Sequence, residues 1–578
     1  MNFWKSLSEL RRDQLRVLPW LLGKQEKRIA VLLVLAVAAS LGFVGVNVAK
    51  RFSKTAPAYG GSLREGAVGI PRFVNPLLAV SDVDRDLVAL VYEGLTRYNE
   101  EGVLVPALAD HFDVSPDGLA YTFRLRADAR WSDDAPLAAD DVMFTIRAAK
   151  NPAYHSAVRA NWEGVAVEKV DERTVRFRLQ KPYAPFLQNT TLGILPAHIW
   201  SSIPATEFNL TERNLKPVGA GPYQALTFEK NSAGRITFYK LERNRATARS
   251  RPYIKNITFM FYATEADLAS GLRAGMIDSA STASAPGAGT ANALPNSRLL
   301  QIELPRVFAV FFNQNLSKAL SDPDVRQALE LATDKAGIIR DVLEGQGTAI
   351  YSPIPPGTFG AADSPLYQDR MFDLTAAKRL LATAGWKDTD GNGILEKKNK
   401  KESIRLAFSI ATSNAPNLVH TGKLLQKMWR DTGASVELKV YELGDFEQNV
   451  LRPRKYDAVL FGEVVGHDPD PFAFWHSSQR NDPGLNIALY TNTKVDALLE
   501  KARATTDPEV RRARYEDFQK ELKADTPAVF LYSPLYIYAI PTTLHGVSTR
   551  AVSLPNDRFN SIEQWYIKTR RVWSIAGK

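Results

Sequence analysis

The stretch DGLAYTFRLRADARW, residues 117–131, carries the clearest local fold signal in the chain. Within it, LAYTFRLR (119–126) alternates apolar and polar side chains, which is typical of a β-strand with one buried face. The same alternation returns in TVRFRL (174–179), whereas DRDLVALVYEGL (84–95) has apolar residues at helical spacing. Strand and helix patterns follow one another along the chain, so we expect a mixed α/β fold.

Two longer stretches extend this pattern toward the carboxyl terminus. SDPDVRQALELATDKAGIIRDVL (321–343) opens with Ser and Asp beside Pro323, a combination that favours the start of a helix. TPAVFLYSPLYIYAI (526–540) is rich in residues that favour strands. A chain of 578 residues is too long for one ordinary core, and we therefore expect several folding units.

The composition narrows the chemistry open to this protein. The chain is 45% hydrophobic and 24% charged, which is typical of a globular protein, and it contains no cysteine. The lack of cysteine excludes disulfides, zinc–thiolate sites, thiol nucleophiles and a lipid-modified cysteine.

The formal net charge of +10 belongs to the two ends of the chain. Residues 1–28, 50–54 and 550–578 together carry a net charge of +11, which leaves the body between 55 and 549 near −1. Basic segments beside a membrane favour anionic lipid headgroups. Because the sequence has no basic stripe or stacking motif, we expect no binding to nucleic acid.

One apolar run is long enough to cross a membrane. IAVLLVLAVAASLGFVGVNVA (29–49) is interrupted only by Ser40 and Asn47, and about 20 residues span a bilayer. We interpret it as an uncleaved membrane anchor. A cleaved signal peptide is the alternative, because the run ends in the small residue Ala49. The run exceeds the usual ~7 to 15 residues of a signal peptide, however, and a long polar segment precedes it.

The flanking charges predict the orientation of this anchor. Residues 11–28 contain six Lys and Arg, and residues 50–67 contain four. This bias favours an amino terminus inside the cell. We therefore expect a single-pass protein of the cell membrane, with a basic cytoplasmic segment (1–28) and a large extracytoplasmic body that is periplasmic or extracellular.

Five stretches stand out together, in chain order: residues 73–145, PVGAGPYQ (217–224), FFNQNL (311–316), DPDPFAFW (468–475) and YTNTKVDALLEKA (490–502). Together they resemble one known family, the family 5 extracellular solute-binding proteins of ABC transporters, which includes the oligopeptide- and dipeptide-binding proteins. The resemblance covers nearly everything after Gly61.

The resemblance implies a two-lobed fold like that of periplasmic binding proteins, with an extra domain on the first lobe. The lobes would be joined by a hinge and would close on a ligand held between them. After the anchor (29–49) and a linker (50–60), the implied first lobe is 61–92, 191–300 and 530–578, the extra domain is 93–190, and the second lobe is 304–529.

HDPDPFAFWH (467–476) is the densest cluster of candidate site residues. Its spacing of His and Asp matches no standard zinc arrangement, so we expect no metal and no other cofactor. No nucleophile elbow or paired-carboxylate signal points to catalysis, and we expect no enzyme activity. The prolines restrict the loop and the aromatics offer rigid apolar area, which favours ligand contact by His467, Asp468, Asp470, Phe472 and Trp475. The alternative is a turn whose aspartates cap backbone amides while its aromatics face the core.

The sequence departs from its peptide-binding relatives just before this cluster. Those relatives usually have an Asp a few positions before the DPD motif, where it pairs with the free amino group of a peptide. This chain has Val465 at that position and Glu463 two positions earlier. Either Glu463 replaces the usual anchor or the ligand is not a peptide with a free amine.

Other candidates lie outside the cluster. Asn313 and Asn315 follow an apolar stretch and offer side-chain amides to a ligand, or they form a turn. Asn486 and Tyr490 are further candidates for ligand contact. DTDGNGILE (388–396) begins like a calcium loop, but its twelfth position is Asn399 instead of Glu, so a plain hairpin turn is the favoured alternative.

The predicted function is a membrane-tethered receptor, expected to be a monomer, that captures an oligopeptide-like solute and delivers it to an ABC transporter permease. Two alternatives remain open. One is a binding module without transport, such as a sensor or a chaperone-like protein. The other is a receptor for an oligosaccharide or a metal chelate.

Overall fold

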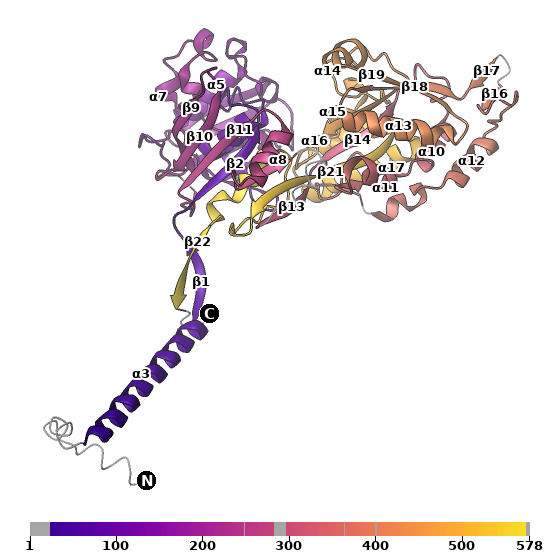
Figure 1. The fold of residues 1–578 in the computed structure, drawn as a ribbon. Helices are drawn as coiled ribbons and strands as arrows, with labels where there is room; N and C mark the ends of the chain where they lie inside the picture. The colour runs from indigo at the N-terminus through magenta and orange to yellow at the C-terminus, as the bar shows by residue number, and fades with distance from the viewer. Residues whose placement is uncertain (1–22, 248, 283–295, 363, 399–401, 574–578) are drawn as a thin grey trace. The chain divides into compact units, whose positions relative to one another are not determined.

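The computed structural model describes residues 23–247, 249–282, 296–362, 364–398 and 402–573 (Figure 1). These residues form two compact units. One unit combines the segment that ends at Tyr59 with the segment that begins at Lys568, and the other unit is Gly60–Ile567. Most of the predicted basic segment, residues 1–22, lies outside the described residues, as do 283–295 of the predicted first lobe.

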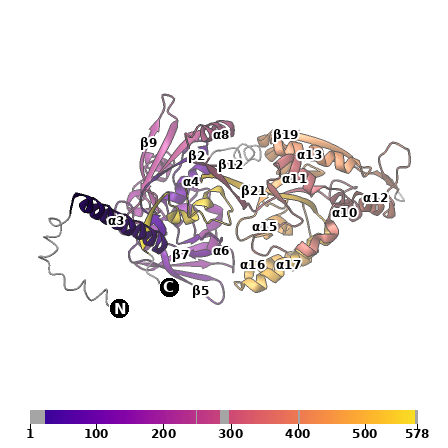
Figure 2. The ribbon, with the colours of Figure 1, turned by 60° about the horizontal axis from the view of Figure 1, so that its bottom comes forward.

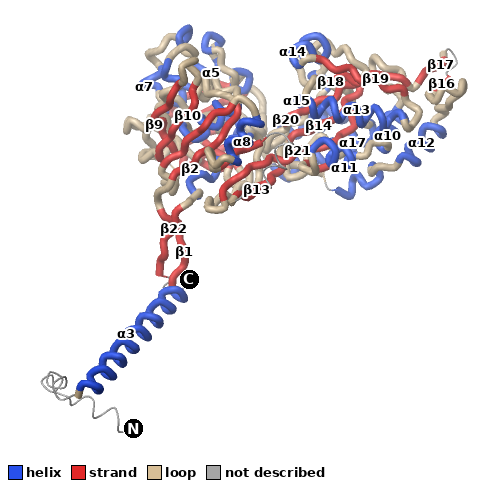
Figure 3. The backbone as a smooth tube through the Cα atoms, viewed as in Figure 1, coloured by secondary structure: helices blue, strands red, loops and turns tan. Residues whose placement is uncertain are grey.

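The first unit consists of one long helix and a two-stranded sheet (Figure 3). α3 (Lys24–Phe52) contains the whole apolar run, and over Lys24–Val44 it is long and apolar enough to cross a bilayer. β1 (Ser53–Ala58) follows α3 directly and pairs antiparallel with β22 (Lys568–Trp573). The predicted linker 50–60 is therefore largely regular, because pairing with a distant segment satisfies its backbone groups.

The first lobe is built on a mixed sheet, and its strand order continues outward from β21. The predicted helix at 84–95 is confirmed as α4 (Asp82–Val91), which begins earlier because the Ser81 hydroxyl accepts a bond from the Asp84 amide at 3.1 Å. The other elements are β2 (Ser62–Val68), β9 (Tyr223–Lys230), β10 (Ile236–Arg243), β11 (Asn256–Tyr262), β12 (Ser279–Thr282), β13 (Ser297–Glu303), α7 (Ala197–Trp200), α8 (Glu265–Arg273) and the 3-10 helix η9 (Pro555–Gln564).

The predicted extra domain contains an antiparallel sheet in the order β5, β6, β8, β7. Both alternating stretches seen in the sequence are confirmed as neighbouring strands of this sheet, β6 (Ala120–Leu125) and β8 (Thr174–Leu179). Their apolar side chains face a core that runs without a break into the first lobe. The remaining elements are β3 (Thr96–Tyr98), β4 (Leu104–Pro106), β5 (Ala109–Val114), β7 (Val165–Asp171), α5 (Ala139–Lys150) and α6 (Phe186–Asn189).

The second lobe has a sheet in the order β19, β18, β20, β14, β21, with a hydrophobic core on each face. The predicted helix start at Asp322–Pro323 is confirmed, but the stretch 321–343 forms two helices, because Asp334 caps a second one. The elements are β14 (Arg306–Phe312), β15 (Gly347–Ala349), β16 (Glu396–Lys398), β17 (Ser403–Arg405), β18 (Ala407–Ser413), β19 (Ser435–Tyr441), β20 (Ala458–Val464), α10 (Pro323–Leu331), α11 (Lys335–Leu343), α12 (Leu374–Thr383), α13 (Pro416–Arg430), α14 (Leu443–Asp445), α15 (Phe472–Trp475), α16 (Thr493–Ala504) and α17 (Pro508–Asp525).

The chain passes between the sheets of the two lobes at two places that lie side by side. The first is Leu304–Pro305, between β13 and β14. The second lies within β21 (Ala528–Pro541), whose first half pairs with β14 and whose second half pairs with β13 (Figure 1). The Ser533 hydroxyl donates to the Leu304 carbonyl at 2.6 Å and ties the two crossings together. Such paired crossings are suited to act as a hinge.

Candidate ligand-binding cleft

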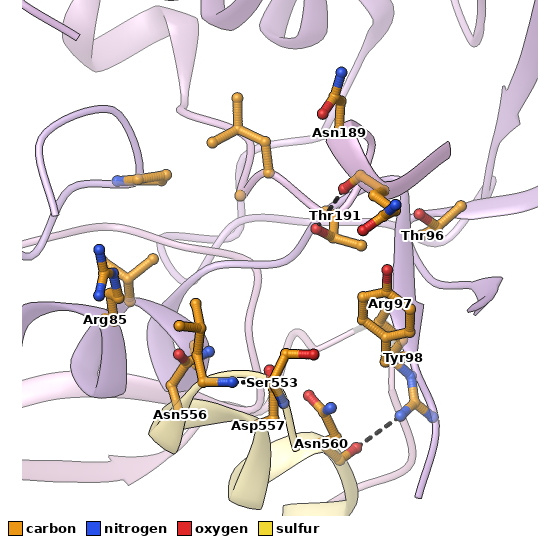
Figure 4. A pocket seen from close by; sticks show the side chains of 18 of the residues that line it. Arg85, Thr96, Arg97, Tyr98, Asn189, Thr191, Ser553, Asn556, Asp557 and Asn560 are labelled. Carbon is orange, nitrogen blue, oxygen red and sulfur yellow. Dashed lines mark hydrogen bonds between the residues drawn. The ribbon is translucent and has the colours of Figure 1, made fainter. Parts of the chain in front are cut away.

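A cavity of about 510 Å³ lies where the first lobe and the extra domain meet a short segment of the second lobe (Figure 4). This volume is within the range of small-molecule sites. The first lobe contributes part of α4 and the start of η9, and β3 forms another wall. The second lobe contributes only residues 464–467, the segment that connects β20 to the HDPDPFAFW loop.

Uncharged polar groups line this cavity without hydrogen-bond partners. The buried side-chain atoms of this lining that have no hydrogen-bond partner within the described part of the chain include Tyr98 Oη, Ser553 Oγ, Asn556 Oδ1 and Asn560 Nδ2. Burial raises the pKa of the Tyr98 hydroxyl, so the group stays a neutral O–H donor. Because unmade hydrogen bonds are costly, these donors and acceptors indicate a site for a polar ligand.

The charged groups of the cavity wall neutralise one another. Arg249 Nη2 donates to Glu93 Oε1 at 3.0 Å, and Arg97 Nη2 donates to Glu563 Oε1 at 3.2 Å. Burial disfavours the charge on Arg249, but Glu93 and Glu563 outweigh it and raise the pKa of the guanidinium above its usual value. Arg97 Nη1 also donates to the Asn560 carbonyl at 2.7 Å, which fixes β3 against η9 (Figure 4). These charges stabilise the wall and leave recognition to the neutral groups.

His467 is the predicted site residue that the structure places in the cavity. Its Nε2 donates to Asp557 Oδ2 at 3.0 Å, and its ring lies 4.4 Å from the ring of Tyr98, centroid to centroid. Asp557 also accepts bonds from the backbone amides of Ser553 and Leu554 at 2.7 and 3.0 Å. His467 thus joins the second lobe to the cavity wall of the first.

The next residues of the loop contact the extra domain, α16 and α17 rather than the cavity. Gln188 Nε2 donates to the Asp468 carbonyl at 2.8 Å, and the Asp468 carboxylate pairs with Arg511. Asp470 accepts from Arg503 Nε at 2.9 Å, and the Arg503 guanidinium lies 3.9 Å from the ring centre of Phe472. In Figure 2, α16 accordingly lies beside the part of the extra domain that contains α6. These three residues do not line this cavity: arginines pair with the two carboxylates, and the Arg503 guanidinium lies over the Phe472 ring. Contact between them and a ligand remains a prediction.

Five further candidates lie away from the cavity, in the second lobe. Trp475 is 1% exposed and packs against Phe311, Tyr490 and Phe530. Asn486 is fully buried, and its amide bonds the carbonyls of His476 and Tyr490 at 3.1 and 3.0 Å. Their polar groups serve the fold of the lobe, so the cavity does not include them.

In the turn after β14, the polar side chain of Asn313 also forms hydrogen bonds within the second lobe. Asn313 Nδ2 donates to the Arg454 carbonyl at 3.2 Å, and Asn313 Oδ1 accepts from the Asn315 amide at 3.1 Å. Asn313 is buried and Asn315 is exposed at the surface of the turn. Asn313 and Asn315 thus form a turn, and contact between either side chain and a ligand remains a prediction.

Glu463 has no charged partner among the described residues of the second lobe. It lies on β20 beside Val464 and Val465 of the cavity wall, it is 6% exposed, and its Oε1 has no hydrogen-bond partner among the described residues. Burial raises the pKa of this carboxyl well above its usual value. A ligand cation brought to this position would favour the ionised form. Contact between Glu463 and a ligand remains a prediction.

The calcium-like stretch forms a turn between α12 and the β16–β17 hairpin. Asp388 Oδ1 and Oδ2 accept bonds from the amides of Gly391 and Gly393 at 2.8 and 2.9 Å. These bonds lower the pKa of Asp388. Asn392 Oδ1 accepts from the Ile394 amide at 2.8 Å, so the oxygens of the stretch serve the turn; Asn399 lies outside the described residues. Across the described chain, no group of three or more His, Asp or Glu side chains is arranged to hold a metal ion.

Comparison with known proteins defines the class of this protein. Residues 103–485, more than half of the chain, match the family model for bacterial extracellular solute-binding proteins, family 5 Middle. The chain belongs to this family. The family resemblance and the mixed α/β fold of the periplasmic-binding-protein type, both predicted from the sequence, are thereby confirmed.

Individual relatives agree with this assignment. The chain is 29% identical over 552 residues to the oligopeptide-binding protein AppA of Bacillus subtilis (strain 168), covering 93% of this chain and 98% of that one. The structure of Bacillus subtilis AppA in complex with a nonapeptide has a TM-score of 0.67 at 28% identity, covering 89% and 100% of the two chains. The structure of NikZ from Campylobacter jejuni in complex with Ni(L-His) has a TM-score of 0.68 at 28% identity, covering 87% and 99%.

Sequence reasoning missed most of the cavity wall. Arg97 and Tyr98 lie inside the 73–145 block that carried the resemblance, but nothing in their spacing marks them as site residues. Asn556 and Asn560 lie in a carboxyl-terminal segment that stood out only for its basic charge. Their spacing of four is no signal either, because η9, which brings both to the cavity, is a 3-10 helix with three residues per turn.

Proposed function

We propose that this chain is an extracytoplasmic receptor that captures an oligopeptide-like ligand in the cavity and delivers it to an ABC transporter permease, without chemical change to the ligand. The observation that carries the proposal is the set of unpartnered neutral groups on Tyr98, Ser553, Asn556 and Asn560. A peptide backbone offers both N–H donors and C=O acceptors to such groups. The peptide named with AppA, a protein related along most of its length, supports this ligand class.

The second lobe supplies the selective part of the proposed site. Glu463 is buried beside the segment 464–467 that reaches the cavity, and a peptide's free amine would provide the cation that this carboxyl lacks. Residues 464–467 also lie close to the crossing at Pro305, whose carbonyl accepts from the Val465 amide at 3.0 Å. A ligand held there contacts both lobes and favours the closed population.

The proposed tether is α3, with the body outside the cytoplasm and the receptor monomeric. The apolar window over Lys24–Val44 has no side chain buried against the rest of the chain, which is consistent with a lipid-facing helix. An uncleaved helix would hold the receptor at the membrane in place of a lipid-modified cysteine. Amino-terminal sequencing of the protein from its own membranes decides between anchor and signal peptide.

One alternative ligand class has a specific observation in its favour. NikZ, of similar fold, was solved with Ni(L-His). Because the described residues form no metal-holding cluster, a chelate would have to bring its own donors and use the neutral cavity groups for orientation.

Native mass spectrometry of the purified protein tests the ligand class. We expect release of peptides of mixed sequence. A single oligosaccharide or a metal-containing adduct would replace the peptide assignment. Loss of uptake of the released ligand on deletion of a neighbouring permease gene would then separate a transport receptor from a sensor.

A further inference from the structure

The β1–β22 ribbon brings the carboxyl-terminal strand β22 next to the point where α3 ends (Figure 1). Only Ser53, the C-cap of α3, separates the last helical residue from the rest of β1. Ser53 pairs with Trp573, and the register then runs to Ala58 opposite Lys568. The pairing therefore holds the end of β22 next to the end of the proposed membrane helix.

This ribbon is basic and has no acidic residue. The strands read SKTAPA and KTRRVW, and the side chains of Lys54, Lys568, Arg570 and Arg571 are exposed. Among the described residues, none of these four forms an ion pair. Because side chains alternate along a strand, Lys54, Arg570 and Lys568 share one face, and Arg571 lies on the other.

We propose that the β1–β22 ribbon binds the anionic headgroups of the membrane in which α3 is anchored. The inference rests on the proposed anchor. The apolar run ends at Ala49, and Arg571 and Arg570 lie opposite Thr55 and Ala56. Three helical residues and three or four strand residues place these arginines within about 18 Å of the end of the run. The headgroup layer is about 5–8 Å thick, and screening acts over about 8 Å, so the arginine side chains reach its field.

Two features favour a lipid surface over a protein partner. The cations lie on both faces of the ribbon, whereas a folded partner would contact one face. An isolated pair of strands is also marginally stable in water, and among the described strands β1 and β22 pair only with each other. Contact with a charged surface on all sides of the helix end supplies the missing stabilisation.

Hydrogen exchange tests the proposal on the full-length protein in vesicles. One set of vesicles contains phosphatidylcholine alone, and the other contains phosphatidylcholine mixed with phosphatidylglycerol. We expect amides of β1 and β22 to exchange at least about tenfold more slowly on the anionic vesicles, and added salt to remove the difference. Amides of the body, Gly60–Ile567, should exchange alike on both and report that the protein is folded.

Two variants match each other in charge. The triple variant Lys54→Gln, Arg570→Gln, Arg571→Gln should lose the dependence on anionic lipid. The control Lys423→Gln, Lys427→Gln, Arg430→Gln removes three exposed cations from α13 and should keep it. Lys568→Gln, at the far end of the ribbon, should have the smaller effect of a single distant charge.

Several outcomes would overturn the proposal. Equal exchange of the ribbon on both vesicles, or a triple variant that behaves like the parent, would show strand pairing without lipid contact. Slow exchange in native membranes but not in anionic vesicles would assign the ribbon to a protein partner. Release of the protein from vesicles by an alkaline wash would contradict the anchor itself, which separates failure of the proposed tether from failure of the ribbon.

Discussion

Buried carboxylates in the two lobes have opposite surroundings. In the first lobe, Arg558 donates to Glu65 Oε1 at 3.0 Å and to Asp86 Oδ1 at 2.7 Å, and the Tyr538 hydroxyl donates to Glu65 at 2.8 Å. In the second lobe, Glu463 is equally buried but has no cation beside it in the described chain. The first arrangement is complete within the protein, whereas the second lacks a partner that a ligand would supply.

This difference between paired and unpaired buried carboxylates indicates where a ligand is expected to bind. Burial still raises the pKa of Asp86 to about 6 in spite of Arg558, which shows how strongly the interior disfavours a carboxylate. A buried carboxyl without a partner lowers the stability of the folded protein. Such a group is therefore expected at a position where a bound ligand supplies the missing partner.

The largest expected effect comes from removing the partner of the complete cluster. Arg558→Met leaves two buried carboxyls unpaired and should lower the free energy of unfolding by about 3–5 kcal/mol. Urea denaturation measures this loss of unfolding free energy. The control is Arg512→Met, which removes a single exposed arginine. A loss below about 1 kcal/mol would show that the cluster does not stabilise the first lobe.

The second prediction concerns the incomplete site. If peptides are the ligands, Glu463→Gln should weaken binding at least about tenfold, or about 1.4 kcal/mol. The same peptide with an acetylated amino group should bind parent and variant alike. Calorimetry with a peptide identified by mass spectrometry measures both; unchanged affinity for the free-amine peptide would remove Glu463 from the site.

The third prediction is a pH dependence. The pKa of Glu463 is raised in the folded protein, so the folded state holds a proton that the unfolded state has released. Its contribution to stability is therefore present below the unfolded pKa and is lost as pH rises from about 4.5 toward the folded value, by at most about 1.4 kcal/mol per pH unit. Without ligand, Glu463→Gln should be increasingly more stable than the parent over this range. Parallel stability curves would contradict a raised pKa.

A smaller effect is expected from a neutral cavity group. Tyr98→Phe removes a hydroxyl that has no partner in the unliganded protein, so the free energy of unfolding should change by less than about 0.5 kcal/mol. Ligand affinity should fall by about 0.5–1.5 kcal/mol. Tyr456→Phe is the matched control, because the Tyr456 hydroxyl donates to the Ile487 carbonyl inside the second lobe. That variant should lose stability without losing intrinsic affinity; the reverse pattern would place Tyr98 outside the site.

The smallest effect is expected from calcium. The Asp388 and Asn392 oxygens are already engaged by backbone amides. Millimolar calcium should leave the melting temperature unchanged, and a clear rise would restore the calcium alternative for this turn.

Sequence patterns predicted individual helices and strands better than the contacts between distant segments of the chain. The alternation at 119–126 and 174–179 correctly indicated strands, and Asp322 beside Pro323 correctly marked a helix start, because these features depend on near neighbours. The aromatic and acidic residues of the loop 467–476 are suited both to a cavity wall and to a contact with another domain, so the sequence does not distinguish these two roles. Only the position of Arg503 and Gln188, from distant segments, distinguishes the two.

By itself, the sequence determined the α/β class, the apolar helix and the family, since periodicity, run length and ordered motifs are local properties of the chain. The tertiary structure alone decided that Tyr98 and Asn556 line the same cavity, that Asp470 forms an ion pair with Arg503, and that β1 pairs with β22. Such contacts between distant segments depend on which surfaces bury each other and which polar groups form hydrogen bonds with each other. No window of the sequence contains that information.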